Sequence, residues 1–262
     1  MTGGSASIQG PLWGARARDW AEVQEAICRP LYDAILSQTG IAPNTRILDV
    51  GCGAGLFCSL AAGRGANVSG LDAAPALLEI AKERVPSGAF REGEMETLPY
   101  PDRTFDLVTG FNSFQFATRP PAALAEARRV ARPGASVAIA TWGKPEDCEA
   151  AHFLAALRPL LPPAPSGAPG PFALSADGAL EGFARDAGLT PRRVDEVDCP
   201  FEYPDLETAL RGLLAGGPVV RALQTSGEER VREAVVQAIT PFRLSSGGYR
   251  LENSFLLVTA TA

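Results

Sequence analysis

The sequence predicts an α/β fold, in which a mostly parallel, doubly wound sheet carries helices on both faces. Between residues 46 and 142, short apolar runs alternate with segments of helical periodicity, as strands and helices of a parallel sheet do. One of these runs passes directly into three alternating glycines, Gly51, Gly53 and Gly55, and then into a helical segment. A chain of 262 residues that is 46% hydrophobic is long enough for one large domain, or for a core domain with an insertion.

The elements of the core are predicted in order along the chain. Apolar residues at helical spacing predict a first helix at 17–39, which Pro30 bends or divides, after a Gly- and Ser-rich start that we expect to be mobile. Buried strands are predicted at 46–50, 67–71, 105–110 and 136–142. The helices between them are predicted at 56–62, 75–84 and 122–130, and Arg132, Pro133 and Gly134 are expected to end the last one.

Beyond residue 142 the regular alternation ends. Residues 158–171 contain six prolines, too many for a regular element, so we expect a loop or a lid there. Helices are predicted at 146–157, 177–187, 206–214 and 228–239, and strands at 193–199 and 249–261. The expected organisation is an N-terminal helical cap (1–45), a core (46–143), a Pro-rich lid insertion (144–176) and a completion of the sheet (177–262) that carries a second helical lid insertion at about 203–246.

The composition argues against several classes of partner. The formal net charge is −6 and no cluster of Lys and Arg forms a phosphate-facing stripe, so we expect no nucleic-acid partner. The sequence has neither a signal-peptide pattern nor an apolar stretch of membrane-spanning length, so we expect a cytoplasmic protein that does not bind a membrane. The five cysteines are an odd number spread along the chain, and we expect reduced thiols and no metal site.

The glycine loop and the acid before it indicate the kind of ligand. Glycines allow a sharp turn and a close approach to a ligand, which in open α/β sheets binds outside the carboxyl ends of the strands. A phosphate loop would need a Gly-Lys-Ser/Thr ending, which is missing. A dinucleotide fingerprint would need Gly or Ala in place of Leu56, and would put Asp49 beside a pyrophosphate. S-adenosylmethionine has no phosphate and carries a sulfonium and a protonated amine, so Asp49 suits it.

Two further acids are predicted near the ends of the neighbouring strands. Asp72 ends the second strand, where an acid can accept hydrogen bonds from both ribose hydroxyls, and Glu94 lies in the segment that follows. Each acid has a structural alternative: Asp49 and Asp72 can cap a helix or hold the loop, and Glu94 can simply be solvated. The three glycines together with these acids favour a cofactor site.

Four motifs in this order resemble the class I S-adenosylmethionine-dependent methyltransferases, particularly the small-molecule branch with the ubiquinone/menaquinone-type C-methyltransferases. The motifs are ILDVGCGAG, GLDAAPALLEIAKER, GEMETLPYPDRTFDLV and ARPGASVAIATW, and they cover residues 46–142. The resemblance implies a Rossmann-like sheet of seven strands with the last one antiparallel. The chain departs from the branch at Glu94 and Met95, where Asp-Ala is usual, and at Gln115, where relatives often have His.

The resemblance also implies which residues bind the cofactor. They are Asp49, Gly51 and Gly53 beside the methionine part, Asp72 at the ribose, Glu94 and Met95 at the adenine, and Ala73 and Leu77 in the adenosine pocket. The candidate site is completed by neighbouring residues, of which the aromatic ones are candidates for its walls: Trp20, Cys52, Glu96, Phe111, Asn112 and Phe116.

The expected reaction is methyl transfer to O, N or C of a small, largely apolar metabolite, with S-adenosylhomocysteine as the second product. His152, the only histidine, is a candidate general base, although such a residue more often has a surface or packing role. Two alternatives stay open: an NAD-dependent oxidoreductase on a related fold, and a protein that binds S-adenosylmethionine without turnover. The sequence indicates neither the acceptor nor the oligomeric state.

Overall fold

The computed structural model describes residues 4–163 and 170–262. Its centre is a seven-stranded sheet with the strand order β3-β2-β1-β4-β5-β9-β6. The strands are β1 (Arg46–Val50), β2 (Asn67–Asp72), β3 (Ala89–Glu92), β4 (Phe105–Phe111), β5 (Ala131–Trp142), β6 (Thr190–Asp198) and β9 (Ser254–Thr261). Strand β9 pairs antiparallel with β5 and β6, whereas the other pairs are parallel. The predicted doubly wound sheet with an antiparallel last strand is confirmed.

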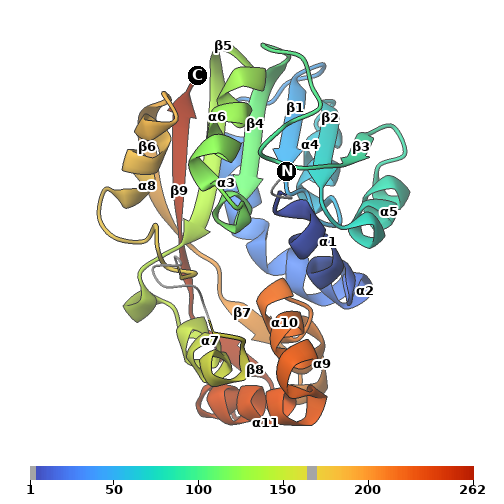
Figure 1. Cartoon of the computed structure of the whole chain (residues 1–262), viewed down its shortest axis with the longest axis vertical. Helices are drawn as coiled ribbons and strands as arrows, with labels where there is room; N and C mark the ends of the chain where they lie inside the picture. Colours follow the sequence, from blue (N-terminus) through green and yellow to red (C-terminus); the bar gives the residue numbers. More distant parts are fainter. Residues whose placement is uncertain (1–3, 164–169) are drawn as a thin grey trace.

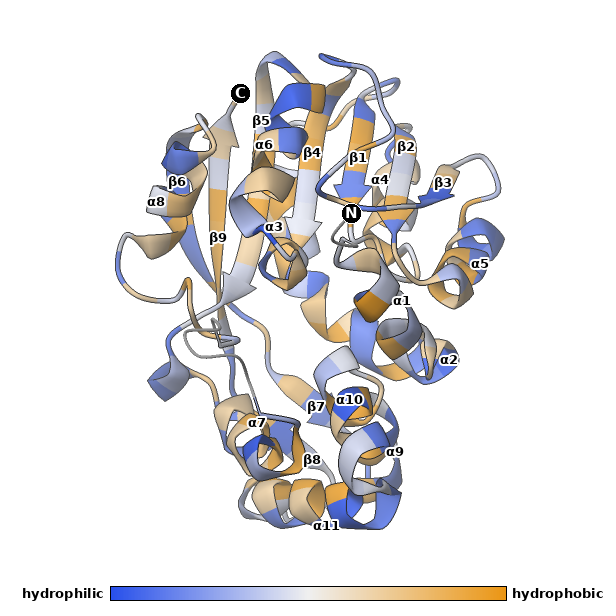
Figure 2. Ribbon diagram, viewed as in Figure 1, coloured by the Kyte–Doolittle hydropathy of each residue, from blue (hydrophilic) through white to orange (hydrophobic). Residues whose placement is uncertain are grey.

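Helices cover both faces of this largely hydrophobic sheet (Figures 1 and 2). Helices α3 (Arg29–Gln38), α4 (Leu56–Ala62) and α5 (Pro75–Arg84) pack on one face, and α6 (Pro120–Val130) and α8 (Ala179–Asp186) on the other. Side chains of β5 alternate between the two faces: Ala138 and Ala140 pack with α3 and α4, whereas Val137 and Ile139 pack with α6 and α8. Burial on both sides explains why these strands are continuous apolar runs.

Four further helices form a lobe beyond the carboxyl-terminal edge of the sheet (Figure 1). This helical lobe consists of α7 (Ala150–Leu157), α9 (Leu206–Leu213), α10 (Gly217–Ser226) and α11 (Glu228–Ile239), with a two-stranded sheet of β7 (Phe201–Tyr203) and β8 (Tyr249–Leu251). The lobe therefore faces the side of the sheet on which ligands of open α/β folds bind.

The N-terminal segment forms a helix, so the prediction of a mobile start is wrong. Helix α1 (Ala6–Gly14) begins at the carboxylate of Glu94, which accepts hydrogen bonds from Ser5 Oγ (3.0 Å) and Ala6 N (2.8 Å). Gly10 lets the helix approach the core, because a Cβ atom there would lie 2.1 Å from the carbonyl oxygen of Ala73. These contacts come from residues distant in sequence, and local periodicity cannot reveal them.

The predicted first helix is divided close to Pro30, as expected. Helix α2 (Ala17–Asp19) is followed by a π-helical turn (Trp20–Gln24), a 3-10 turn (Glu25–Cys28) and then α3. Pro30 lies in the first turn of α3, where the N–H that proline lacks has no helical partner.

The predicted last strand is two strands rather than one, because β8 and β9 pair in different sheets. The break falls at Asn253, whose buried side chain accepts a hydrogen bond from Ala150 N (2.9 Å) and donates one to the Leu251 carbonyl (3.0 Å). These bonds turn the chain inward and attach α7 to the end of the sheet.

Several other bounds differ from the sequence prediction. Strand β5 begins at Ala131, so Arg132, Pro133 and Gly134 lie inside it, next to a register shift in the pairing with β4. Helix α7 begins at Ala150 rather than at 146, and β3 and α10 were not predicted.

Residues 164–169 of the predicted Pro-rich lid lie outside the described residues, and its lid role stays a prediction. In the described part of the chain, no helix has the length and apolarity needed to cross a membrane.

Candidate functional site

The glycine loop lies where the strand order reverses, between β1 and β4. Gly51, Gly53 and Gly55 all have positive φ angles of 74°, 55° and 79°, which explains why glycine occupies each position. The loop is fixed to the next strand because Gly53 N donates a hydrogen bond to Asp72 Oδ2 (2.8 Å). Such a reversal point opens a crevice at the carboxyl ends of the strands.

A cavity covers this loop, and we call it the loop cavity. Every predicted cofactor residue except Glu96 lines it. Those residues are Trp20, Asp49, Gly51, Cys52, Gly53, Asp72, Ala73, Leu77, Glu94, Met95, Phe111, Asn112 and Phe116. The structure therefore brings together residues from the first three predicted strand ends and from the N-terminal cap.

Glu96 does not line the loop cavity. Its buried carboxylate accepts hydrogen bonds from Arg119 N (2.9 Å) and Arg119 Nε (3.0 Å), immediately before α6. Glu96 thus fixes the start of α6, and its place beside Glu94 in the sequence does not put it at the same site.

Helix α1 supplies part of the cavity wall that the sequence did not predict. Ser5, Ala6, Gln9 and Trp13 all line the loop cavity. Trp13 packs edge-on against Trp20, with ring centroids 4.9 Å apart. The segment has two glycines and an internal proline, so its sequence carries no helical signal that would have marked these residues.

Glu25 is a second contribution that the sequence did not reveal. Its side chain is 3% exposed, lines the loop cavity and forms an ion pair with Arg84 of α5. Arg84 also donates to the carbonyl oxygens of Ala54 (2.9 Å) and Ala21 (2.7 Å). Burial raises the pKa of Glu25, and Arg84 opposes that shift. This pair ties the N-terminal cap, the glycine loop and α5 together around the cavity.

Asp49 is a buried acid at the floor of the loop cavity. It is 2% exposed and accepts a hydrogen bond from Thr109 Oγ1 (2.7 Å). Burial raises the pKa of Asp49 to about 7, the Thr109 bond opposes the shift, and the nearby Glu25 and Asp72 carboxylates add to it. Asp49 therefore ionises near neutral pH, and a cation bound beside it would favour the charged form.

Asp72 has a structural role as well as a place in the cavity. Besides Gly53 N, it accepts a hydrogen bond from Ala74 N (2.8 Å) just before α5. Burial raises its pKa, although these backbone bonds oppose the shift. The structural alternative drawn from the sequence is thus present in the fold. Each carboxylate oxygen has two acceptor sites, so the backbone bonds leave capacity for ligand hydroxyls.

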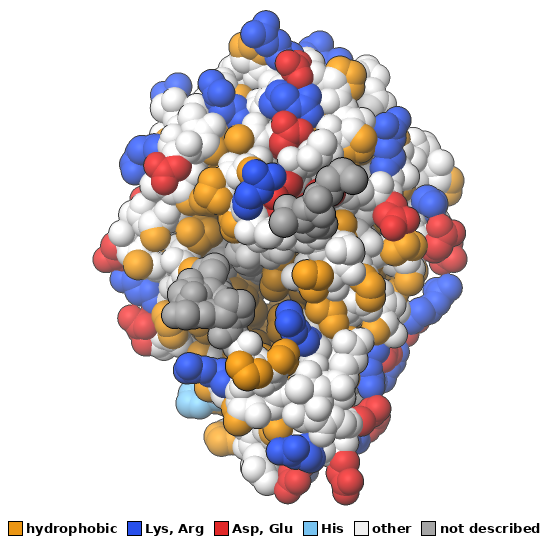
Figure 3. All heavy atoms as spheres, viewed as in Figure 1, with side chains coloured by type: hydrophobic (Ala, Val, Ile, Leu, Met, Phe, Trp, Pro, Cys, Tyr) orange, Lys and Arg blue, Asp and Glu red, His pale blue; other side chains and the backbone are white. Residues whose placement is uncertain are grey.

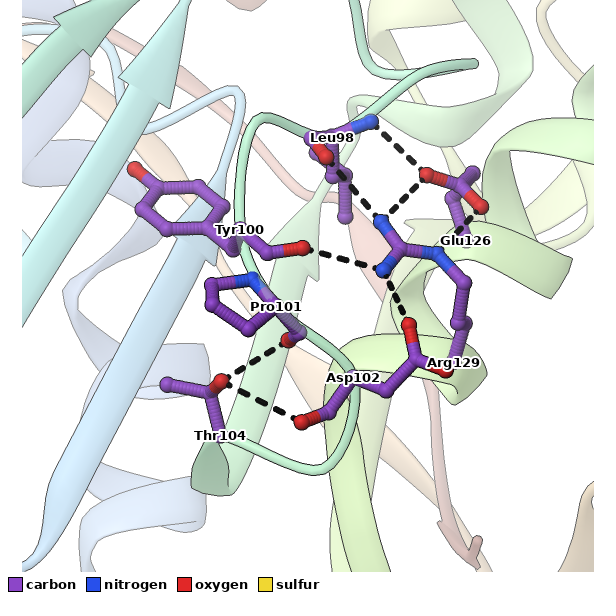
Figure 4. Close-up of polar contacts among 7 residues, drawn as sticks. All are labelled: Leu98, Tyr100, Pro101, Asp102, Thr104, Glu126 and Arg129. Carbon is purple, nitrogen blue, oxygen red and sulfur yellow. Dashed lines mark hydrogen bonds and ion pairs between the residues drawn. The ribbon is translucent and has the colours of Figure 1, made fainter.

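The segment that follows Glu94 is held in place by Arg129 of α6 (Figure 4). The guanidinium donates to the carbonyl oxygens of Leu98 (3.0 Å) and Tyr100 (2.9 Å), and to the carboxylates of Glu126 and Asp102. Glu126 also accepts a hydrogen bond from Leu98 N (2.8 Å). This network explains how an irregular loop can present Glu94 and Met95 at a fixed position.

Two buried polar groups at the loop cavity have no hydrogen-bond partner among the described residues: Trp20 Nε1 and Ser113 Oγ. A Cβ atom on Gly53 would lie 3.4 Å from Trp20 Nε1, so this donor faces the glycine loop. Buried polar groups are normally paired, and here a ligand can satisfy them. Free hydrogen-bonding groups beside the buried acids fit a polar, cationic ligand such as S-adenosylmethionine.

A second cavity lies between the sheet and the helical lobe, and we call it the lobe cavity. Its volume of about 310 Å³ is within the range of small-molecule sites. Figure 3 shows the hollow on this face, with hydrophobic side chains gathered around it. Five residues line both cavities, Trp13, Trp20, Cys28, Asn112 and Phe116, and we call them the shared wall.

His152 lines neither cavity. It is exposed on α7, and its ring packs edge-on against Phe242 with centroids 5.3 Å apart. A general base must lie within hydrogen-bond reach of the proton it removes, so the structure argues against the base role predicted for His152.

Comparison with known proteins places residues 48–139 in the family described as a methyltransferase domain. An uncharacterised protein of Mycobacterium tuberculosis is 32% identical over 197 residues, which are 71% of each chain. The malonyl-[acyl-carrier protein] O-methyltransferase of Serratia marcescens is 33% identical over 127 residues, which are 48% of this chain and 50% of that enzyme. The crystal structure of the YcgJ protein of Bacillus subtilis superposes with a TM-score of 0.61 at 18% identity, over 88% of this chain and 97% of YcgJ. The family match includes the glycine loop, Asp72 and Glu94, and it leaves out α1 and the helical lobe.

Proposed function

Because the chain belongs to the class I S-adenosylmethionine-dependent methyltransferases, we propose that it binds S-adenosylmethionine in the loop cavity and methylates a small molecule in the lobe cavity. The observation that carries this proposal is the shared wall, through which the two cavities adjoin. Methyl transfer needs its two reactants held in contact in one orientation, and adjoining cavities provide that arrangement.

Different residues of the loop cavity bind different parts of S-adenosylmethionine. Asp72 accepts hydrogen bonds from the ribose, Glu94 and the Met95 backbone bind the adenine, and Asp49 with Gly53 contacts the methionine end. Support comes from their position at the carboxyl ends of the strands, and from the buried acids that attract a cation.

When bound, S-adenosylmethionine supplies a methyl group on a positively charged sulfur. The aromatic side chains of the shared wall exclude water and fix the direction from which an acceptor approaches. Among the described residues that line the lobe cavity there is no Asp, Glu, His, Lys or Tyr. This lining therefore contributes orientation and desolvation to the reaction.

The lobe cavity favours a largely apolar acceptor. Its lining is dominated by aromatic and aliphatic side chains, including Trp142, Phe153, Phe201 and Phe255. Such a surface recognises shape and hydrocarbon area rather than a pattern of hydrogen bonds.

The family match decides against the oxidoreductase alternative, and only a turnover measurement addresses the alternative of binding without catalysis.

The experiment that tests the proposal measures S-adenosylhomocysteine formed from S-adenosylmethionine with a panel of small apolar acceptors carrying hydroxyl, carboxyl or amine groups. Product that depends on both enzyme and acceptor supports methyl transfer. Tight donor binding with no product from any acceptor would favour the non-catalytic alternative.

Filling the lobe cavity should separate turnover from donor binding. Leu154 of α7 is partly exposed and lines only the lobe cavity, so in the Leu154→Trp variant the larger side chain takes up acceptor space. We expect turnover to fall by about tenfold or more, because the indole occupies volume that the acceptor needs and displaces it from its reactive position. The affinity for S-adenosylhomocysteine should not change. The control is Ala155→Trp, at an exposed position of the same helix outside both cavities; equal turnover in the two variants would contradict the acceptor role.

Donor binding should depend on pH through Asp49, whose pKa is about 7. A cationic ligand binds the ionised form better, so binding lowers this pKa and releases a proton at acidic pH. Affinity for S-adenosylmethionine, which carries a sulfonium and an ammonium, should rise with pH, by at most about tenfold per unit, and level off above pH 7. Calorimetry on wild type and Asp49→Asn tests this, with Asp33→Asn on α3 as control. The same pH dependence in Asp49→Asn would contradict the assignment.

A further inference from the structure

The lobe cavity has one charged side chain among its described lining residues, that of Arg158. Arg158 begins the 3-10 turn (Arg158–Leu160) that follows α7, and its side chain is exposed. It forms no ion pair or side-chain hydrogen bond with any described residue. Residues 1–3 and 164–169 contain no Asp or Glu, so they provide no carboxylate side chain for it either. This cation therefore has no acidic partner within the chain.

The amide side chains of the lobe cavity already have partners among the described residues. Gln24 Oε1 accepts a hydrogen bond from Tyr203 Oη (2.9 Å), and Gln115 Nε2 donates one to Asn112 Oδ1 (3.1 Å). Arg158 differs from them, since none of its five N–H donors is bonded to a described residue. A positively charged acceptor would meet this guanidinium without any carboxylate to offset the repulsion, whereas a negatively charged group would form a charge-assisted hydrogen bond with it.

Arg158 and the shared wall are different parts of the lobe-cavity lining. Arg158 does not line the loop cavity and is not part of the shared wall. A group bound by Arg158 would therefore be separate from the atom that receives the methyl group. Between them, the apolar lining accommodates hydrocarbon.

We propose that the acceptor is an amphipathic organic anion whose apolar body fills the lobe cavity and whose acidic group is bound by Arg158, an inference that rests on the proposed function of this cavity. Arg158 is then a specificity-determining residue. Guanidinium is suited to this task because it presents several donors in a planar fork to an oxyanion.

A matched pair of fluorescent probes tests the proposal without knowledge of the natural acceptor. The anionic probe is 1-anilinonaphthalene-8-sulfonate, and the neutral probe is N-phenyl-1-naphthylamine, which has the same aromatic body without the sulfonate. Both are titrated in the presence of saturating S-adenosylhomocysteine, so that the loop cavity is occupied. In Arg158→Gln we expect the affinity for the anionic probe to fall roughly tenfold and that for the neutral probe to stay unchanged.

Two further variants make the result specific. Arg221→Gln removes an exposed arginine of α10 that lines neither cavity, and should leave both probes unaffected. Arg158→Lys keeps the charge without the planar fork and should bind the anionic probe with an affinity between those of wild type and Arg158→Gln. The proposal is overturned if Arg158→Gln binds the anionic probe as wild type does, or if both probes lose affinity equally. Failure of S-adenosylhomocysteine to bind the wild type would instead refute the proposed function, so the two failures are distinguishable.

Discussion

Gly53→Val should abolish measurable binding of S-adenosylhomocysteine while the protein stays folded. Gly53 has a φ of 55°, and a Cβ atom there would lie 3.2 Å from Glu25 Oε1 and 3.4 Å from Trp20 Nε1. The two methyl groups of valine extend further into the loop cavity, where the donor must approach the backbone closely. We expect a loss of affinity of at least about a hundredfold, whereas the left-handed conformation costs about 1–2 kcal/mol of folding stability.

Gly178→Val is the matched control for this variant. Gly178 has a φ of 75°, has no described neighbour within 4 Å of the Cβ position and lines neither cavity. It should lose similar stability, measured by thermal unfolding, and keep the wild-type affinity in calorimetry. Wild-type affinity in a folded Gly53→Val would show that the donor does not bind over the glycine loop.

Asp72→Ala should weaken donor binding by roughly 2–3 kcal/mol, because two hydrogen bonds to a charged acceptor are lost. The same change frees Gly53 N and Ala74 N, so thermal stability should also fall. Asp72→Asn separates these effects, since its amide oxygen can still accept one of the backbone bonds. We expect Asp72→Asn to be closer to wild type in stability than in affinity for S-adenosylhomocysteine. A stability loss in Asp72→Ala with unchanged affinity would reduce Asp72 to a structural cap.

The sheet and the glycine loop were predictable because their signals are local. Buried parallel strands are continuous apolar runs, and β1, β2 and β4 were placed to within one residue at each end. The acids Asp49 and Asp72 follow from the same logic, since each occupies a strand end beside the loop. The resemblance to methyltransferases rested on this core, and the family match at residues 48–139 confirms it.

The parts that were not predictable depend on contacts between distant residues. Helix α1 begins on the carboxylate of Glu94, and its sequence alone looks like a flexible tail. Glu25 lines the loop cavity because the cap folds back on Arg84, which no spacing rule indicates. Glu96 was predicted to bind the cofactor because it lies two positions from Glu94. Its carboxylate instead accepts a hydrogen bond from Arg119.

The residues of the proposed acceptor site in the helical lobe were likewise not predictable from local sequence patterns. Arg158 was part of a Pro-rich stretch in the sequence, and nothing local marked it as a cavity residue. Its place in the lobe cavity follows from the packing of the 3-10 turn 158–160 against α7 and α10. His152, on the same helix α7, packs against Phe242 and lines neither cavity. Local patterns therefore predict the donor side, whereas the acceptor side needs the tertiary structure.

The proposed donor site is tested most directly by the position of the sulfur atom in a crystal structure of the complex with S-adenosylhomocysteine. We expect the ribose to lie at Asp72, the adenine at Glu94 and Met95, and the sulfur at the shared wall, facing the lobe cavity. A ligand seated outside the loop cavity, or a sulfur turned away from the shared wall, would contradict the account.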